Sequence, residues 1–376
     1  MKSTLKKTQK GITLVALVVT IVVLLILAGV SINLVLGNNG IIAKAKDAET
    51  KSAEASQNDL KGMNALTEEM NNALGEKPKV DLSKYKIGDY VNYTYDIAEN
   101  YVLTSATCGS SSNPADGIPQ TAGLKWRILN IDEANGTVDL ISENPTDTTV
   151  YFFGALGYHN GPYLMNAICE SQYSNSALNV KARNISLLDM EKQLTTAGIA
   201  ARNGYSGGLV QYGKTKTYNY SYYPLLYDGQ KGSGVNVTEA NASKIAQPNT
   251  DAGNDPYNES VETTSPLTDK TSKQADNKVL TVTKTFYYIP INKTNYGEAY
   301  KVLSNSKTYW VSGRCVNTDS SHACFGLRYA GANLNGGMFI SGSSGNNKDC
   351  RLRPVVFLSS SILSETKDAS GAWNLK

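Results

Sequence analysis

An apolar run near the N-terminus constrains the fold of this chain more than any other feature. It extends over 25 residues, from Ile12 to Leu36, without a charged side chain. A helix of that length is roughly 37 Å long, and the hydrocarbon core of a bilayer is about 30 Å thick. Val, Ile and Leu occur all around the helix, so the run lacks the polar face of an interfacial helix. We therefore expect residues 12–36 to span a membrane.

The charges that flank this run predict its orientation. The residues before Gly11 include four lysines and no acid, and the first acid in the chain is Asp47. The positive-inside rule then places the N-terminus in the cytoplasm and the C-terminal bulk outside. An ordinary signal peptide has an apolar region of only about 7–15 residues, so the longer run favours a membrane anchor. The leader lysines are Lys2, Lys6, Lys7 and Lys10.

The start of the run resembles the N-terminal segment of type IV prepilins and pseudopilins. The resemblance rests on the basic leader, residues 1–11, and on Gly11 followed by Ile12-Thr13-Leu14. It implies that a prepilin peptidase cleaves between Gly11 and Ile12 and methylates the new amine. It also implies that residues 12–36 act both as anchor and as the assembly helix that contacts other pilin-like subunits. An uncleaved, single-span surface binding protein is the alternative.

One position departs from the family pattern. The fifth residue after the cleavage site is usually Glu, which is thought to pair with the N-terminal amine of a neighbouring subunit, and this chain has Ala16 there. An unpaired charge in a dry helix bundle costs several kcal/mol. Ala16 therefore favours a minor or tip subunit over a major one, or a filament system that handles the N-terminal amine differently.

A second helix is expected between the anchor and the remainder of the chain. Gly37-Asn38-Asn39-Gly40 interrupts the apolar run, and glycine lowers helix stability by about 1 kcal/mol relative to alanine. Residues 41–75 are then rich in Ala, Lys and Glu, and no proline occurs before Pro78. We expect an exposed helix over 41–75 that connects the anchor to a globular head over residues 80–376.

The head has the pattern of an α+β domain with a mainly antiparallel sheet and short helices. Its clearest signal is a β-hairpin, in which residues 125–131 and 137–142 flank the turn Asp132-Glu133-Ala134-Asn135-Gly136. Ser186 is a candidate N-cap, with Asp189 in the first turn. Residues from about 228 to 278 form a polar insertion. Helices are expected at 163–173 and 187–197, and further strands at 87–93, 285–291, 307–311, 324–329, 337–341 and 352–358.

Several blocks of the head resemble heads found behind pilin-like N-termini in Firmicutes, notably clostridia. The stretch from Phe325-Gly326-Leu327-Arg328 to Arg353-Pro354-Val355-Val356 is also weakly similar to the last strands of C-type-lectin-like folds. That similarity implies a ligand-binding loop surface between residues 330 and 348. The blocks are residues 126–131, 157–161, 182–185, 309–314 and 352–356.

The sequence contains no recognisable catalytic or metal-binding set. His322 lies two residues before Cys324, but no third group orients such a pair, so we expect no enzyme and no cofactor. The spacing of the five cysteines does not match a zinc site, and export makes Cys315 and Cys350 a candidate disulfide. The formal charge is +3, and loss of the leader leaves −1, so nucleic-acid binding is not expected.

These features predict a cell-membrane protein with one span and its C-terminus outside, which then reaches the cell surface or a filament. The expected partners are the prepilin peptidase, the membrane, other pilin-like subunits of a pilus or type II secretion-like system, and an unidentified surface ligand. The expected role is adhesion or recognition.

Overall fold

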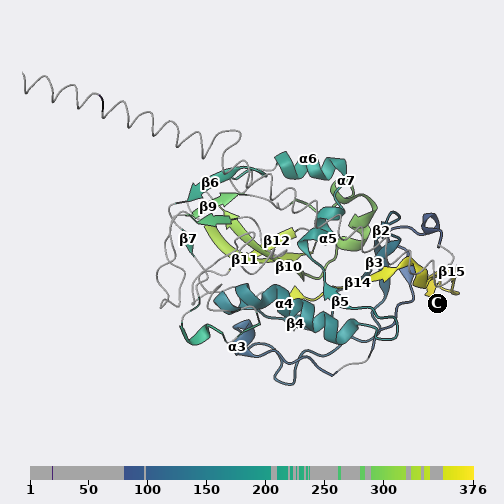
Figure 1. The fold of residues 1–376 in the computed structure, drawn as a ribbon. Helices are drawn as coiled ribbons and strands as arrows, with labels where there is room; N and C mark the ends of the chain where they lie inside the picture. Colours follow the sequence, from purple (N-terminus) through teal and green to yellow (C-terminus); the bar gives the residue numbers. More distant parts are fainter. Residues whose placement is uncertain are drawn as a thin grey trace, which may run out of the picture. The chain divides into compact units, whose positions relative to one another are not determined.

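In the computed structural model, the part of the chain that is described begins, apart from Val19, at Val80. The predicted leader, membrane helix and exposed helix therefore lie outside the described residues. The chain divides into two compact units, Met1–Lys77 and Pro78–Lys376, and the second is the head (Figure 1). The described residues are Val19, 80–96, 99–204, 210–218, 221–222, 226, 228–232, 234–235, 237, 261–263, 280–283, 289–318, 323–331, 334–338 and 350–376.

Among these residues, no helix combines the length and the apolar character needed to cross a membrane.

The first sheet of the head combines strands from both ends of the domain. Its neighbouring strands run antiparallel, except that β1 and β16 run parallel. The last strand of the chain therefore pairs with the first one within this sheet. The strand order is β15 (Leu363–Lys367), β16 (Trp373–Leu375), β1 (Tyr90–Val91), β2 (Trp126–Asp132), β3 (Thr137–Ser142), β14 (Pro354–Ser359) and β5 (Ala182–Asn184).

The remaining strands of the described head form a second and a third sheet. The second is built around a long antiparallel pair with a bulge between Val311 and Arg314. Its order is β12 (Leu334–Met338), β11 (Ala323–Ala330), β10 (Tyr309–Thr318), β13 (Cys350–Arg351) and β4 (Thr149–Val150), with β7 (Ser221–Tyr222) pairing with β11. The third has the order β6 (Thr215–Tyr218), β9 (Leu280–Thr283) and β8 (Val261–Thr263).

Helices lie on both sides of the β10–β11 pair (Figure 1). In that view α3 and α4 lie on one side, and α5, α6 and α7 lie on the other. The α-helices are α3 (Ser105–Cys108), α4 (Gly154–Tyr173), α5 (Leu187–Lys192), α6 (Thr196–Gly204), α7 (Lys293–Tyr296) and α8 (Tyr300–Leu303). The 3₁₀ turns are η1 (Leu82–Lys84), η2 (Asp228–Gln230), η3 (Gly297–Ala299) and η4 (Ser360–Ile362).

The strands contribute side chains to two separate hydrophobic cores, because successive side chains along a strand point to opposite faces of the sheet. On β10, Trp310 packs into the core that includes α4, while its neighbours Tyr309 and Val311 pack into the core that includes α5 and α8. The same alternation holds for Val355 and Val356 on β14. Both faces are therefore buried at these positions, which explains the short apolar runs Tyr309-Trp310-Val311 and Pro354-Val355-Val356.

The structure confirms the predicted α+β class with mostly antiparallel sheets. The predicted hairpin is present as β2 and β3, with Ile131 opposite Val138. Its turn is held by Asp132, whose carboxylate accepts hydrogen bonds from the backbone and side-chain nitrogens of Asn135 at 3.0 and 2.7 Å. Gly136 adopts φ +61°, a conformation that favours glycine. The predicted Ser186 cap is also confirmed, because Ser186 and Asp189 form a reciprocal capping box.

Several predicted boundaries are wrong. Helix α4 begins at Gly154, nine residues before the predicted start, and the predicted helix 187–197 is two helices, α5 and α6. The predicted strand 87–93 is reduced to the two residues of β1. Of the predicted strand 285–291, only residues 289–291 are described, and no named strand covers them. Most of the polar insertion at 228–278 lies outside the described residues, although it contains β8.

Candidate functional site

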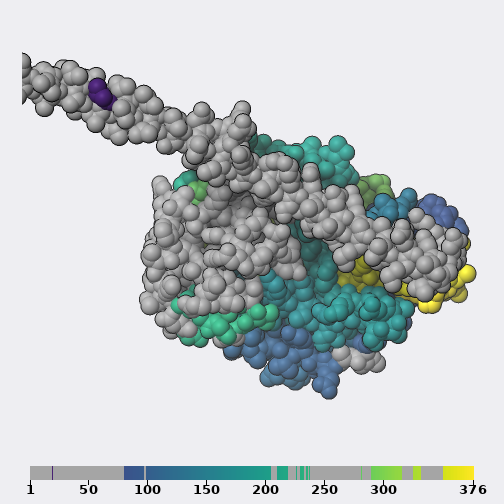
Figure 2. All heavy atoms as spheres, viewed as in Figure 1, coloured from purple at the N-terminus to yellow at the C-terminus, as the bar shows by residue number. Residues whose placement is uncertain are grey.

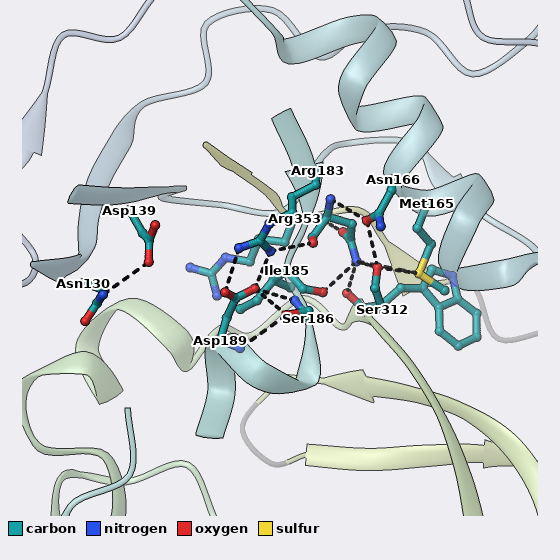
Figure 3. Close-up of polar contacts among 12 residues, drawn as sticks. Asn130, Asp139, Met165, Asn166, Arg183, Ile185, Ser186, Asp189, Ser312 and Arg353 are labelled. Carbon is teal, nitrogen blue, oxygen red and sulfur yellow. Dashed lines mark hydrogen bonds and ion pairs between the residues drawn. The ribbon is translucent and has the colours of Figure 1, made fainter. Parts of the chain in front are cut away.

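A network of buried polar side chains joins the two larger sheets (Figure 3). Its centre is Asn184 at the end of β5, which has no exposed surface. The Asn184 carboxamide donates to the carbonyl of Trp310 at 2.9 Å and to the Ser312 hydroxyl at 3.2 Å, both on β10. Its side-chain oxygen accepts the backbone N–H of Arg353 at 2.8 Å. One amide therefore fixes β5 to β10 and to the residue that precedes β14.

The Arg353 guanidinium is fully buried and donates to backbone carbonyls in two other segments. It bonds the carbonyls of Ser142 at 3.2 Å and Glu143 at 3.0 Å, at the end of β3. It also bonds those of Leu303, at 2.9 Å, and Val302, at the end of α8. Burial lowers the pKa of Arg353, but arginine stays protonated in proteins. The fork of donors thus replaces the hydration of the charge and satisfies carbonyls that end a strand and a helix.

An ion pair extends the network to α5. The Arg183 guanidinium bonds both carboxylate oxygens of Asp189, at 2.5 and 2.8 Å, and the same carboxylate accepts from the backbone and hydroxyl of Ser186. Burial by itself would raise the pKa of Asp189, but Arg183 and Ser186 lower it overall. The carboxylate is therefore charged at neutral pH and fixes the start of α5 to β5.

A second buried carboxyl, Asp139 on β3, has a weaker set of partners. Asn130 donates to it at 3.3 Å, and 5% of the residue is exposed. Burial raises the pKa of Asp139, and the nearby Asp189 carboxylate raises it further. Because its pKa in the folded chain lies above the ordinary 3.8, ionised Asp139 lowers stability at neutral pH, and this cost is absent below that ordinary pKa.

We therefore expect Asp139→Asn to increase the free energy of unfolding at neutral pH, with a gain that shrinks as the pH falls towards 3.8. The new amide oxygen still accepts the Asn130 hydrogen bond. Urea titrations of both proteins at a series of pH values measure the gain. The control Asp116→Asn, at an exposed residue, should change stability by less than about 0.5 kcal/mol at every pH. A gain that is the same at every pH would contradict the account.

Arg314 on β10 compensates for a proline inside α4. Pro162 has no N–H, so the carbonyl four residues earlier, that of Tyr158, lacks its helical donor. The Arg314 guanidinium donates to this carbonyl through Nε at 2.8 Å, and it also bonds the carbonyl of His159. Gly161 allows the close approach, because a Cβ there would lie 2.5 Å from a Leu327 methyl on β11. Contacts with the sheet thus complete a helix that its own sequence interrupts.

We expect Arg314→Met to destabilise the head by about 2 kcal/mol, because it removes the donor to two buried carbonyls. The loss should be smaller by about 1 kcal/mol in a Pro162→Ala background, where residue 162 regains an N–H for Tyr158. A double-mutant cycle by urea denaturation measures this coupling. Additive losses would show that Arg314 does not act through the missing helical bond.

Most of the sequence-predicted site residues lie outside the described residues. Gly11, Ile12, Thr13, Leu14 and Ala16 lie outside the described residues, as do the leader lysines Lys6, Lys7 and Lys10. His322 is also outside them, and the side chain of Cys324 is not described. His159 is buried in α4, with its ring edge-on to Tyr158 at 5.6 Å. The described residues contain no group of three or more His, Cys, Asp or Glu side chains arranged to hold a metal.

The structure buries both residues of the predicted Cys315–Cys350 disulfide, but at separate positions. Strand pairing gives the reason. Arg351 on β13 pairs with Tyr309 on β10, in parallel, and Cys315 lies six residues further along β10. At about 3.3 Å per residue the two cysteines are roughly 20 Å apart along the strand, whereas a disulfide needs Cα atoms within about 7 Å.

The residues of the network were present in the sequence as charged or amide side chains inside apolar segments, at Ala182-Arg183-Asn184-Ile185 and Leu352-Arg353-Pro354-Val355. Such a pattern signals a buried polar group that needs partners. It does not identify the partners, which come from β3, α5, α8 and β10.

Comparisons of the chain with protein-family models, with curated proteins and with solved structures found no match.

Proposed function

We propose that this protein is a pilin-like or pseudopilin-like subunit that is displayed on the cell surface. A prepilin peptidase cleaves it between Gly11 and Ile12, and residues 12–36 serve as membrane anchor and assembly helix. The observation that carries the proposal is the acid-free basic leader, followed by Gly11 and an uncharged run of 25 residues. The head carries adhesion or recognition, and the proposal assigns it no catalytic activity.

The head's construction is compatible with a display role. Its described polar clusters, around Asn184, Arg353 and Asp189, use their donors and acceptors to join strands and helices. Such interactions favour a rigid body that presents its surface, rather than groups held ready for proton transfer. Ala16 supports the narrower proposal of a minor or tip subunit.

The mature N-terminus tests the processing step. We expect mass spectrometry of the membrane-extracted protein to find methylated Ile12 at the terminus in cells that have the peptidase. Gly11→Ala should leave the leader attached, because cleavage is expected to require glycine there. Gly29→Ala, which changes a glycine inside the run, is the matched control and should be processed normally. An intact Met1 leader on the unmodified chain would support the uncleaved anchor instead.

The position in a filament is tested separately. We expect immunogold labelling of sheared filaments to mark this protein at filament ends. Labelling along the whole filament would contradict the tip assignment and leave the processing result unaffected.

A further inference from the structure

A half-open cleft lies where β1, the start of β2 and the turn between β15 and β16 meet. The C-terminal segment that forms one side of it lies at the molecular surface, yellow in Figure 2. The cleft has a volume of about 290 Å³, close to the lower limit of typical ligand sites. That volume suits one sugar ring or one amino-acid side chain. Six of the lining residues matter for recognition, namely Tyr90, Asn92, Tyr93, Lys125, Trp126 and Ser370.

Aromatic rings form one part of the cleft lining. Tyr93 and Trp126 meet edge to face with ring centroids 4.8 Å apart. Trp126 is 1% exposed, and its indole N–H has no hydrogen-bond acceptor in the described part of the chain. A buried donor without an acceptor is rare and needs an explanation. Tyr90 is 37% exposed and is fixed by a hydrogen bond to Glu143 and by the Arg127 guanidinium, 5.1 Å from its ring centroid.

The polar part of the lining is held in place by Asp368. Its carboxylate accepts from the Asn92 amide at 2.9 Å, from the Ser370 hydroxyl at 2.7 Å and from the backbone of Ala372 at 2.9 Å. The same bonds, that of Ser370 first, lower the pKa of Asp368 to about 2. The turn is therefore ordered before any ligand arrives, which reduces the entropic cost of binding.

The charge of the lining has one sign. Lys125 is exposed at the cleft, and none of the described residues that line it is acidic. A ligand that carries a negative charge is therefore favoured there over a cationic one.

We propose that this cleft binds an acidic saccharide residue, such as a hexuronic acid at the end of a surface glycan. The exposed Tyr90 ring offers aromatic surface to the C–H face of a pyranose ring, and the Asn92 amide oxygen and the Ser370 hydroxyl oxygen match sugar hydroxyl groups as acceptors. Lys125 pairs with the carboxylate. The inference rests on the proposed function for the head's exposure outside the cell and deepens it by naming the ligand class.

The test is a titration of the full-length chain, in detergent micelles, with D-glucuronate, observed through the indole N–H signals of its three tryptophans. Trp126→Phe identifies the signal of Trp126. We expect that signal to move with a dissociation constant on the order of 1 mM, typical of a small polar ligand. Lys125→Gln should weaken glucuronate binding about fivefold, and Tyr90→Ala should weaken it at least as much. The control Lys214→Gln, at another exposed lysine, should leave it unchanged.

Titrations with glucose and with inorganic phosphate distinguish binding through the sugar ring from binding through negative charge alone. Glucose should bind more weakly than glucuronate and should not respond to Lys125→Gln, and phosphate alone should not move the Trp126 signal. The proposal is overturned if glucuronate leaves that signal in place, if Tyr90→Ala has no effect on binding in a folded variant, or if phosphate reproduces the shift. The titration does not depend on cleavage at Gly11, so failed binding and failed processing are distinct results.

Discussion

Arg353→Met is expected to lower the free energy of unfolding by about 4 kcal/mol, among the largest effects of any single change in the head. The guanidinium is fully buried and bonds carbonyls of Ser142, Glu143, Val302 and Leu303. Methionine fills the space but offers no donor, so the carbonyls of Ser142, Glu143 and Val302 lose this partner, while that of Leu303 keeps the Tyr309 hydroxyl. Relief of the buried charge offsets part of this loss. Urea denaturation of the full-length chain in detergent, followed by tryptophan fluorescence, measures the change.

Two further variants separate the shape of the guanidinium from its charge. Arg353→Lys keeps the charge but replaces the planar fork with a single ammonium group, which cannot reach both carbonyl pairs. We therefore expect it to be no more stable than Arg353→Met. Arg351→Met, two residues away, should cost less than about 1 kcal/mol, because the Arg351 Nε has no acceptor in the described part of the chain. Full rescue by lysine would mean that charge alone is required.

Arg183→Met is expected to cost about 3 kcal/mol at neutral pH, because it leaves the Asp189 carboxylate buried without its cation. The two sides of the pair are not equivalent, since the side chain of Asp189 is 3% exposed and that of Arg183 is 37% exposed. Asp189→Ala should therefore cost less, as the remaining guanidinium can hydrate. Lys181→Met is the matched control. It breaks an exposed pair with Glu170 and should cost less than about 1 kcal/mol.

The pH dependence of Arg183→Met follows from the same contacts. Burial raises the pKa of Asp189, and Arg183 is the first of the groups that lower it. Without Arg183 the pKa of Asp189 in the folded chain should rise above its ordinary 3.8. The loss of stability is then fully present above that raised pKa and decreases as the pH falls towards 3.8. Urea titrations across this range measure it, and a loss that is constant with pH would point to packing rather than charge.

The polar network also bears on how the head can serve a display role. Asn184 and Arg353 connect strands from four separate parts of the sequence. Loss of one of these hydrogen bonds therefore weakens the contact between the two larger sheets. A head built this way presents its surface clefts in a fixed shape. The cleft at Tyr90 and Trp126 lies on β1 and β2, in the middle of the strand order of the same sheet that Arg353 stabilises.

Local elements were predictable because their signals lie within a few residues. The hairpin turn at Asp132–Gly136 and the capping box of Ser186 and Asp189 need only near neighbours, and both are confirmed. The first half of α4 was not predictable. Gly161-Pro162 is typical of a turn, and the helix continues because Arg314, far along the chain, supplies a missing donor.

The sequence by itself determined the features that depend on composition and short spacing, namely the uncharged run after a basic leader, the α+β pattern of the head, the hairpin and the helix cap. Only the tertiary structure decided which carbonyls Arg353 bonds, which acid Arg183 pairs with, and that Cys315 and Cys350 lie too far apart along β10 to bond. These outcomes depend on strand order and register, which bring together residues up to 211 positions apart. Once buried, each polar group needs its partner for the head to be stable, because no water replaces a missing hydrogen bond.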